Sequence, residues 1–233
     1  MVFQFDAKWV IEHGAPVGPQ LYRILRERIV RNDLEPGSRI SEAEIAARFS
    51  VSRQPVREAF IKLAEEGLLE IRPQRGTYVR KIAVAAVMDA RFVREAIEAD
   101  VVKLLAETPD PALAADLRGQ LIRQREAADA NDPIRFIALD ERFHRTLAEA
   151  AGKTYAWDLV EGLKSQMDRV RYLSARRFPM QKLVEQHTAI TEAIAAGNGK
   201  AAEATMRQHL REILADIPAI AATLPEFFDE AGS

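Results

Sequence analysis

Strand-like sequence is confined to one short part of this 233-residue chain, and that restriction excludes most fold classes. The runs LLEIR and TYVRK are separated by PQRG, a pattern that is typical of a small β-hairpin. From residue 82 onward no further strand pattern occurs, and apolar residues recur at the spacing of amphipathic helices. The chain is therefore predicted to be mainly α-helical with a single small hairpin.

Three helices are predicted before the hairpin. Helical spacing begins at Gln20, after an irregular start, and the first helix ends before the turn DLEPGSRI. The second helix begins at Ser41, where Glu44 completes a capping-box pattern, and the third begins at Ser52. A supporting helix, two short helices and a hairpin, in this order, predict a winged helix-turn-helix.

The third helix carries the side chains that are best suited to read DNA. Arg53 and Arg57 are four residues apart and therefore share one helix face, from which each guanidinium can bond a guanine in the major groove. The alternative is that both are ordinary solvated arginines. Further candidates for DNA contacts, mainly to phosphates, are Arg48, Ser52 and Gln54.

The hairpin tip and the charge distribution favour the same function. Arg75 and Gly76 place a cation beside a residue that permits close backbone approach to the minor groove. Residues 20–81 carry 13 Lys and Arg against 9 Asp and Glu, whereas residues 82–233 carry 19 against 24. A basic N-terminal part on an acidic remainder is typical of a DNA-binding module joined to a domain that does not touch DNA.

The stretch LEPGSRISEAEIAARFSVSRQPVREAFIKLAEEGLLEIRPQRGTYV, within residues 21–79, closely resembles the DNA-binding domain of the GntR family. The resemblance implies that Arg53, Arg57, Arg75 and Gly76 contact DNA. One departure is Ser50, which occupies a turn position where glycine is usual in the family.

The remainder is predicted to be a bundle of six amphipathic helices joined by short connections. Their approximate ranges are 84–107, 111–130, 133–151, 154–178, 180–196 and 199–224. The expected domains are an N-terminal extension (1–18), a winged helix-turn-helix (19–81), an effector-binding and dimerisation domain (82–225) and a tail (226–233).

Four polar residues of the predicted bundle lie on or beside apolar faces that would turn inward. Asp140 and His144 are one turn apart, and His187 and His209 follow on later helices. This set suits a divalent ion such as Zn, Ni or Mn. The alternative is three separate histidines, each hydrogen-bonded in the core.

Residues 84–214 resemble the FCD effector domain of the FadR-type subfamily. The matching segments are RFVREAIEADVVKLLAE, DERFHRTLAEAAG and EQHTAITEAIAAGNGKAAEATMRQHL. In metal-binding members, an aspartate and three histidines of these segments hold the ion, which implies that role for Asp140, His144, His187 and His209. Lys153 departs from the asparagine that often follows AAG in the family.

Arg94 is the candidate for capturing an effector. A half-buried guanidinium suits bidentate binding of a carboxylate, and the resemblance implies an organic acid as ligand. The alternative is a salt bridge between Arg94 and Glu98, four residues later. Arg169 and Arg171 fit either a cavity lining or a solvated face.

These features predict a DNA-binding transcription regulator, expected to be a repressor. The resemblance to the family implies that it forms a homodimer, binds a pseudo-palindromic operator and responds to a small carboxylate. No cysteine, signal peptide or membrane-length apolar run occurs, so the protein is expected in the cytoplasm without disulfides. Two alternatives stay open, a sensor for which the ion itself is the signal and a metal-dependent hydrolase. No H-E-x-x-H arrangement favours the hydrolase, although Glu141 adjoins Asp140, and no enzyme activity is expected.

Overall fold

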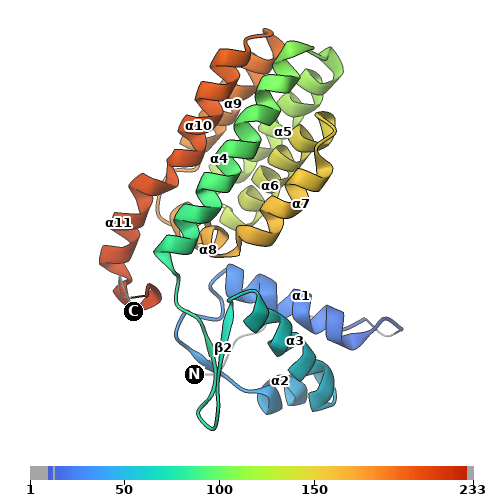
Figure 1. Cartoon of the computed structure of the whole chain (residues 1–233), viewed down its shortest axis with the longest axis vertical. Helices are drawn as coiled ribbons and strands as arrows, with labels where there is room; N and C mark the ends of the chain where they lie inside the picture. The colour runs from blue at the N-terminus through green and yellow to red at the C-terminus, as the bar shows by residue number, and fades with distance from the viewer. Residues whose placement is uncertain (1–9, 13, 230–233) are drawn as a thin grey trace. The chain divides into compact units, whose positions relative to one another are not determined.

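The computed structural model describes residues 10–12 and 14–229, which divide into two compact units (Figure 1). The first unit takes the described residues up to Ile82 together with those from Glu226 on, and the second runs from Ala83 to Pro225. Parts of the N-terminal extension and the tail expected from the sequence lie outside the described residues. The predicted fold class is confirmed, because helices dominate both units and the strands are confined to the first.

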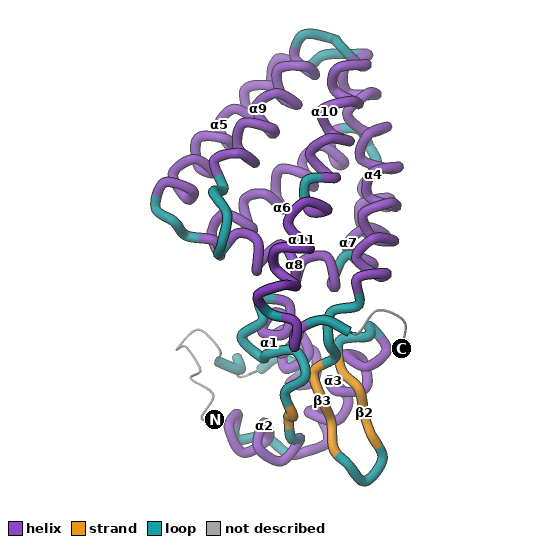
Figure 2. The backbone as a smooth tube through the Cα atoms, turned by 90° about the vertical axis from the view of Figure 1, so that its left-hand side faces the viewer, coloured by secondary structure: helices purple, strands orange, loops and turns teal. Residues whose placement is uncertain are grey.

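The first unit contains three helices and a small sheet. The helices are α1 (Val17–Val30), α2 (Glu42–Phe49) and α3 (Arg53–Glu65), and the strands are β1 (Arg39–Ile40), β2 (Leu69–Arg72) and β3 (Gly76–Val79). The strand order is β1-β3-β2 with antiparallel pairing, and Figure 2 shows β2 and β3 as the arms of one hairpin. The short strand β1 was not predicted, because two residues carry no recognisable alternation.

Three local predictions for this unit need correction. Helix α1 begins at Val17 rather than Gln20, and Pro19 is tolerated because the first helical turn needs no backbone N–H donor there. Ser41 and Ser52 occupy the N-cap positions of α2 and α3, but neither side chain makes a capping hydrogen bond. The predicted capping box is therefore wrong, although both helix starts are within one residue of their expected positions.

Ser50 adopts the backbone conformation that explains why glycine is usual at this turn. It follows α2 with a φ of 54°, in the left-handed region where glycine has the lowest conformational energy.

The core of this unit forms where α1 and α3 face each other, because their apolar residues recur on one side of each helix. The fully buried members include Leu21, Leu25, Ile29, Val56, Phe60 and Leu63.

The second unit is helical among its described residues. Its helices are α4 (Val84–Glu107), α5 (Pro111–Asp129), α6 (Pro133–Ala150), α7 (Thr154–Leu163), α8 (Ser165–Ala175), α9 (Gln181–Ala195), α10 (Gly199–Arg211) and α11 (Ile213–Thr223), followed by the short 3-10 turn Pro225–Phe227. Asp110, Asp132 and Asn198 each accept a backbone hydrogen bond at a helix start. These caps explain why three of the boundaries were predictable.

Two predicted helices are each divided in the structure. The range 154–178 contains α7 and α8, which meet at Lys164, and the range 199–224 contains α10 and α11, which meet at Glu212. Both junction residues use their side chains to join neighbouring helices, since Lys164 pairs with Glu141 and Glu212 pairs with Lys182. No apolar pattern could reveal these ion pairs.

Helices α4, α5, α6, α9 and α10 lie alongside one another and enclose the main core of this unit (Figure 1). The core contains Val102, Phe143, Leu147, Ile190 and Met206, which come from four of these helices. No helix among the described residues is both long and apolar enough to span a membrane.

Candidate functional site

Helix α3 presents its two predicted DNA-reading arginines on the surface of the first unit. Arg53 and Arg57 are exposed, whereas Val56 and Phe60 on the same helix are buried in the core. Arg53 makes an exposed ion pair with Glu42, with 3.1 Å between Nη2 and Oε2. Because solvent-exposed ion pairs are weak, a phosphate or base can replace Glu42 at little cost.

The hairpin tip is shaped by a close approach of backbone and arginine. Gly76 has a φ of 105°, and a Cβ built there would lie 2.7 Å from Nε of Arg39. Any larger residue would therefore displace the Arg39 side chain, which is exposed beside the tip together with Arg75. Arg39 was not among the predicted DNA contacts, since only the pairing of β1 with β3 brings it next to Gly76.

The remaining predicted contacts in the first unit are also exposed. Arg48 lies near the end of α2, and Ser52 and Gln54 lie at the start of α3. The amide of Gln54 donates a hydrogen bond to Glu58, with 3.1 Å between Nε2 and Oε1. All of the predicted DNA-contact residues are thus accessible, apart from the half-buried Gly76.

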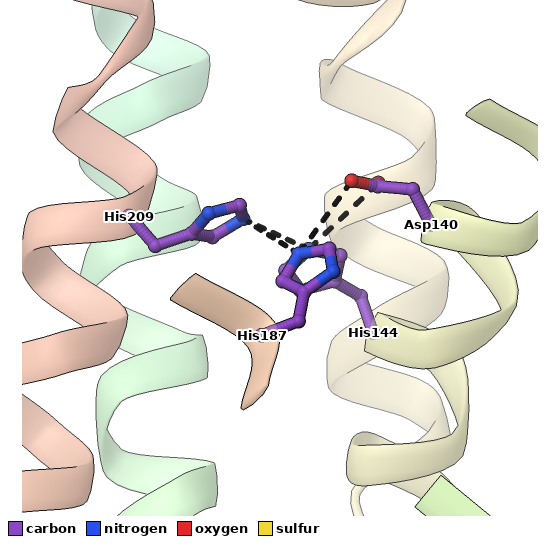
Figure 3. A group of neighbouring side chains, drawn as sticks. All are labelled: Asp140, His144, His187 and His209. Carbon is purple, nitrogen blue, oxygen red and sulfur yellow. Dashed lines mark hydrogen bonds and ion pairs between the residues drawn. The ribbon is translucent and has the colours of Figure 1, made fainter. Parts of the chain in front are cut away.

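The second unit brings the four predicted metal donors together. Asp140 and His144 come from α6, His187 from α9 and His209 from α10, and their donor atoms all lie within 4.8 Å of one another (Figure 3). Nε2 of His209 is 3.2 Å from Nε2 of both His187 and His144. Oδ1 of Asp140 is 3.6 Å from Nε2 of His187. All four residues are buried, so the cluster is an internal site rather than a surface patch.

The opposite nitrogen of each imidazole has its own hydrogen-bond acceptor. Nδ1 of His187 is 2.8 Å from Oε1 of Gln124, and Nδ1 of His209 is 2.9 Å from Oε1 of Gln186. Nδ1 of His144 is 2.6 Å from Oε2 of Glu98. The amide oxygens favour the proton on Nδ1 of His187 and of His209, while Nδ1 of His144 faces a carboxylate.

The two amides are held in the orientation that this tautomer needs. Nε2 of Gln124 donates to the backbone carbonyl of Leu139, and Nε2 of Gln186 donates to Glu212, so each Oε1 faces a histidine. Outer partners of this kind orient metal-binding imidazoles. Gln124 and Gln186 were missed by the sequence analysis, because no local pattern connects them with the histidines.

These donors fit a divalent metal ion. With the protons on Nδ1, the Nε2 atoms of His187 and His209 each carry a lone pair within the cluster, and lone pairs 3.2 Å apart repel each other unless a cation lies between them. Metal–nitrogen bonds of about 2.1 Å in tetrahedral or octahedral geometry place neighbouring donors about 3.0–3.4 Å apart. Imidazole nitrogens with one carboxylate oxygen suit zinc and neighbouring transition metals.

The electrostatic surroundings keep the donors ready to bind a cation. Burial lowers the pKa of His187 to about 3, so its ring is neutral near pH 7. Burial alone would raise the pKa of Asp140, but the guanidinium of Arg171 and the three neighbouring histidines together outweigh this effect, so the net shift of the pKa is downward. Asp140 is therefore ionised, with Oδ2 paired to Arg171 and Oδ1 directed towards the histidines.

Arg94 pairs with Glu98, which is the alternative that the sequence analysis left open. Nε of Arg94 is 2.5 Å from Oε1 of Glu98, and both side chains are buried. Burial alone would raise the pKa of Glu98, but Arg94 and His144 outweigh it and lower the pKa to about 2. Glu98 thus connects Arg94 to His144, one of the four predicted metal donors.

A cavity of about 60 Å³ borders the donor cluster. The polar residues that line it include Arg94, Asp140, Arg171 and His209. Arg169 is fully buried and is not among the residues lining this cavity, so neither arginine of α8 lies on a solvated face. Lys153 is exposed at the start of α7 and does not line it either.

A winged helix-turn-helix with outward arginines, followed by a separate helical unit, defines a DNA-binding transcription regulator. The chain belongs to the GntR family: residues 18–79 match the bacterial regulatory proteins of the gntR family, and residues 89–212 match the FCD domain. The resemblance inferred from the sequence is therefore confirmed. Proteins of this family are named as transcription regulators, which excludes the hydrolase alternative.

Named relatives and solved structures support this assignment. The chain is 44% identical to the HTH-type transcriptional repressor RspR of Escherichia coli over 92% of this chain and 95% of the relative. It is 31% identical to a probable D-xylose utilization operon transcriptional repressor of Paenarthrobacter nicotinovorans, with 85% and 87% covered. A GntR regulator structure from Rhodococcus sp. RHA1 is 26% identical, with a TM-score of 0.72 and 87% and 98% covered.

Proposed function

We propose that the chain is a repressor whose affinity for its operator is controlled by a small organic acid bound at a divalent metal ion. The observation that carries this proposal is the shared cavity: two metal donors, Asp140 and His209, line it together with Arg94 and Arg171. Zn, Ni or Mn would be held by Asp140, His144, His187 and His209. Arginines beside such a site favour a carboxylate ligand.

The cations beside the donors also favour an anion. Arg94 and Arg171 line the cavity, and each is paired with one carboxylate, Glu98 and Asp140 respectively. Glu212 and Asp216 line the cavity as well, and Glu212 is paired with Lys182. A divalent ion adds two positive charges to these groups, so an anionic ligand binds more favourably once the ion is present.

The residues of the chain then have distinct tasks. When bound, the ion supplies a Lewis acid that accepts one oxygen of the effector carboxylate. Arg94 and Arg171 orient that carboxylate, while Glu98 and Asp140 keep both guanidiniums in place. Effector binding changes operator affinity by favouring one of two states of the regulator.

The DNA-binding part of the proposal assigns residues 19–81 to operator recognition and residues 82–225 to effector binding and dimerisation. Arg53 and Arg57 would read base edges, and Arg75 with Gly76 would enter the minor groove. Arg48, Ser52 and Gln54 would contact the backbone. Winged-helix dimers bind two half-sites, so the operator is expected to be pseudo-palindromic.

A surface on α4 and α7 supports the proposal of a homodimer. The two helices are in contact, and large apolar side chains on them are exposed: Met88, Phe92, Tyr155, Leu159 and Leu163. Monomeric proteins rarely expose large contiguous apolar surfaces, so we propose that a second copy covers this one. Light scattering after size exclusion tests it: Leu159→Glu is expected to give monomers and Ile122→Glu, an exposed change on α5, to give dimers.

The experiment that tests the central proposal measures operator binding by fluorescence anisotropy, with an operator selected from random DNA by the full-length protein. The protein is compared after chelation, with zinc alone, and with zinc plus acetate, glycolate or citrate. Zinc with an effective acid is expected to weaken operator binding by about 5–150-fold, the usual range of allosteric coupling. His187→Ala is expected to abolish this response while operator affinity without the acid stays unchanged.

Two results contradict the proposal in different ways. If zinc alone switches operator affinity and acids add nothing, the ion is the signal and the regulator is a metal sensor. If His187→Ala responds to acids like the unmodified protein, the metal centre is not the effector site.

A further inference from the structure

The small sheet of the first unit carries arginines on one face of both its outer strands. β3 lies between β1 and β2, and directly opposite residues of paired strands share a face. Five residues lie on one face by this pairing, and we call it the wing face: Arg39, Glu70, Arg72, Gly76 and Tyr78. Alternate residues of the same strands are buried on the opposite face: Ile40, Leu69, Thr77 and Val79. The wing face is therefore the solvent side of the sheet.

Arg39 extends along the wing face to the start of β3. A Cβ built on Gly76 would be 2.7 Å from Nε and 3.2 Å from Nη2 of Arg39, so a glycine is what leaves room for the guanidinium there. Arg39 is exposed, and no carboxylate pairs with it in the part of the chain that the structure describes. Its charge is therefore available to an anion from outside the protein.

Arg72 is held by two neighbours on the wing face. Its Cζ lies 4.6 Å from the centroid of the Tyr78 ring, which is a cation–π contact. Nη2 of Arg72 also donates a hydrogen bond to Oε2 of Glu70 at 2.8 Å, and these two side chains are 48% and 46% exposed. An ion pair this exposed is weak, so another anion can replace Glu70 while the ring keeps the guanidinium in place.

Tyr78 also connects the wing face with the hairpin tip. Its hydroxyl donates a hydrogen bond to the backbone carbonyl of Arg75, with 3.2 Å between the two oxygens. The side chain of Arg75 is exposed at the tip. One residue of the middle strand thus contacts Arg72 through its ring and the backbone of Arg75 through its hydroxyl.

The charge and the spacing of these arginines fit the DNA backbone. The wing face and Arg75 together contain three arginines and a single carboxylate, that of Glu70. β1 and β2 are two strand spacings apart, or about 10 Å, so Arg39 and Arg72 can contact different phosphates. The minor groove is only about 6 Å wide, so it admits the tip and leaves the residues behind the tip beside the backbone.

We propose, resting on the proposed operator recognition by the first unit, that the wing face binds phosphates of the DNA backbone through Arg39 and Arg72, and that Tyr78 positions Arg72 for this contact. Glu70 then acts as an internal competitor, which occupies Arg72 when DNA is absent. This assignment gives Glu70 and Arg72 opposite effects on DNA binding. If their ion pair only stabilised the hairpin, loss of either partner would act in the same direction.

Titration of the full-length protein by fluorescence anisotropy tests the wing face, with the selected operator and a scrambled duplex at salt concentrations between 50 and 200 mM. Arg72→Gln is expected to make the slope of log affinity against log salt less steep by about 1 on both duplexes, because a phosphate contact carries no sequence information. Glu70→Gln is expected to strengthen binding about 1.4–5-fold, the range of an exposed ion pair. Arg125→Gln and Glu185→Gln, exposed changes of the same charge on α5 and α9, are the controls and should change neither slope nor affinity.

Two substitutions of Tyr78 test its positioning role. Tyr78→Leu is expected to weaken operator binding about 2–5-fold because the cation–π contact with Arg72 is lost, whereas Tyr78→Phe keeps the ring and should retain at least half of the affinity. In the Arg72→Gln protein, Tyr78→Leu should have no further effect, since both residues act on the same contact. The melting temperature of each variant shows whether the first unit is still folded.

The possible results separate this inference from the proposed function. If Arg72→Gln leaves the salt slope unchanged, or if Glu70→Gln weakens binding as Arg72→Gln does, the wing face does not bind phosphates, although operator recognition stands. If Tyr78→Leu weakens binding equally with and without Arg72, Tyr78 does not position that residue. If the full-length protein selects no operator from random DNA, the proposed function itself is overturned.

Discussion

The two units of the molecule both depend on arginines, but they place them in opposite environments. Arg53, Arg57 and Arg75 of the first unit are exposed, whereas Arg94 of the second unit is buried against a carboxylate. An exposed guanidinium is hydrated and can exchange its partner for a phosphate or a base at small cost. A buried pair has lost its hydration, so removal of one partner leaves an uncompensated charge.

This difference in exposure matches the tasks proposed for the two units, which are DNA binding for the first and effector binding for the second. The exposed arginines of the first unit would form their contacts only when DNA binds, and they do not depend on a preformed network of buried hydrogen bonds. The second unit holds its polar atoms in place through partners such as Glu98, Gln124 and Gln186, which is the arrangement that the proposed binding of an ion and an acid requires. In the absence of an effector, a substitution of an exposed arginine in the first unit should leave metal binding by the second unit unchanged, and a substitution of a donor should leave operator affinity unchanged.

The largest effect is expected from removal of a metal donor. His187→Ala deletes one of four donors, and zinc affinity should fall by more than the roughly 10–100-fold typical of outer-partner changes. Competition with a fluorescent chelator measures the affinity. Val184→Ala, a buried change one turn earlier on α9, should retain zinc binding. Equal zinc affinity of both variants would remove the histidine cluster as the metal site.

The next effect concerns the first unit alone. Arg57→Ala should cost about 1–3 kcal/mol of operator binding, or roughly 5–150-fold, because one bidentate contact to a base is lost. Operator titration by anisotropy gives the change, and zinc affinity should not move. Arg125→Ala, an exposed arginine on α5, is the matched control. The separation of the units fails if Arg57→Ala also weakens zinc binding.

A slightly smaller effect is expected from substitution of a residue that hydrogen-bonds a histidine of the cluster. Gln124→Met removes the acceptor for Nδ1 of His187 at similar volume, and zinc affinity should fall by about 10–100-fold. Gln120→Met is a matched control, since Gln120 is equally buried on α5 but bonds Asp116 and Thr146 instead. Competition with a fluorescent chelator measures the zinc affinity of both variants. A similar loss of zinc affinity in both would show that the substitution acts by destabilising the helical unit in general.

The smallest effect is expected at the hairpin tip. Arg39→Gln removes one exposed cation beside Gly76, and the slope of log affinity against log salt should become less steep by about 1. Between 50 and 200 mM salt this is a difference of about 4-fold in operator affinity. Arg125→Gln provides the comparison. An unchanged salt slope would show that Arg39 supports the tip without touching a phosphate.

The comparison also explains what could be predicted from the sequence. Arg53 with Arg57, and Asp140 with His144, are one turn apart on single helices, so a local pattern is enough to place each pair on one face. The expectation that His187 and His209 join Asp140 and His144 came from the family resemblance together with their apolar faces. The structure brings all four donors together.

The partners of those residues were beyond sequence reasoning for a physical reason. Gln124 is 63 residues from His187, and Arg171 is 31 residues from Asp140, so only the packing of different helices creates these contacts. The breaks at Lys164 and Glu212 were missed because no proline stands at either position to mark the end of a helix in the sequence.

The three histidines come from α6, α9 and α10, so an ion held by them would tie these three helices together and couple the metal supply to the stability of the unit. An ion present at 1,000 times its dissociation constant adds about 4.1 kcal/mol to the free energy of unfolding, a large share of the reserve of an ordinary domain. In a metal-starved cell the helical unit would therefore unfold more often and become accessible to proteases. Target genes would then lose their regulator through degradation, without any acid having bound.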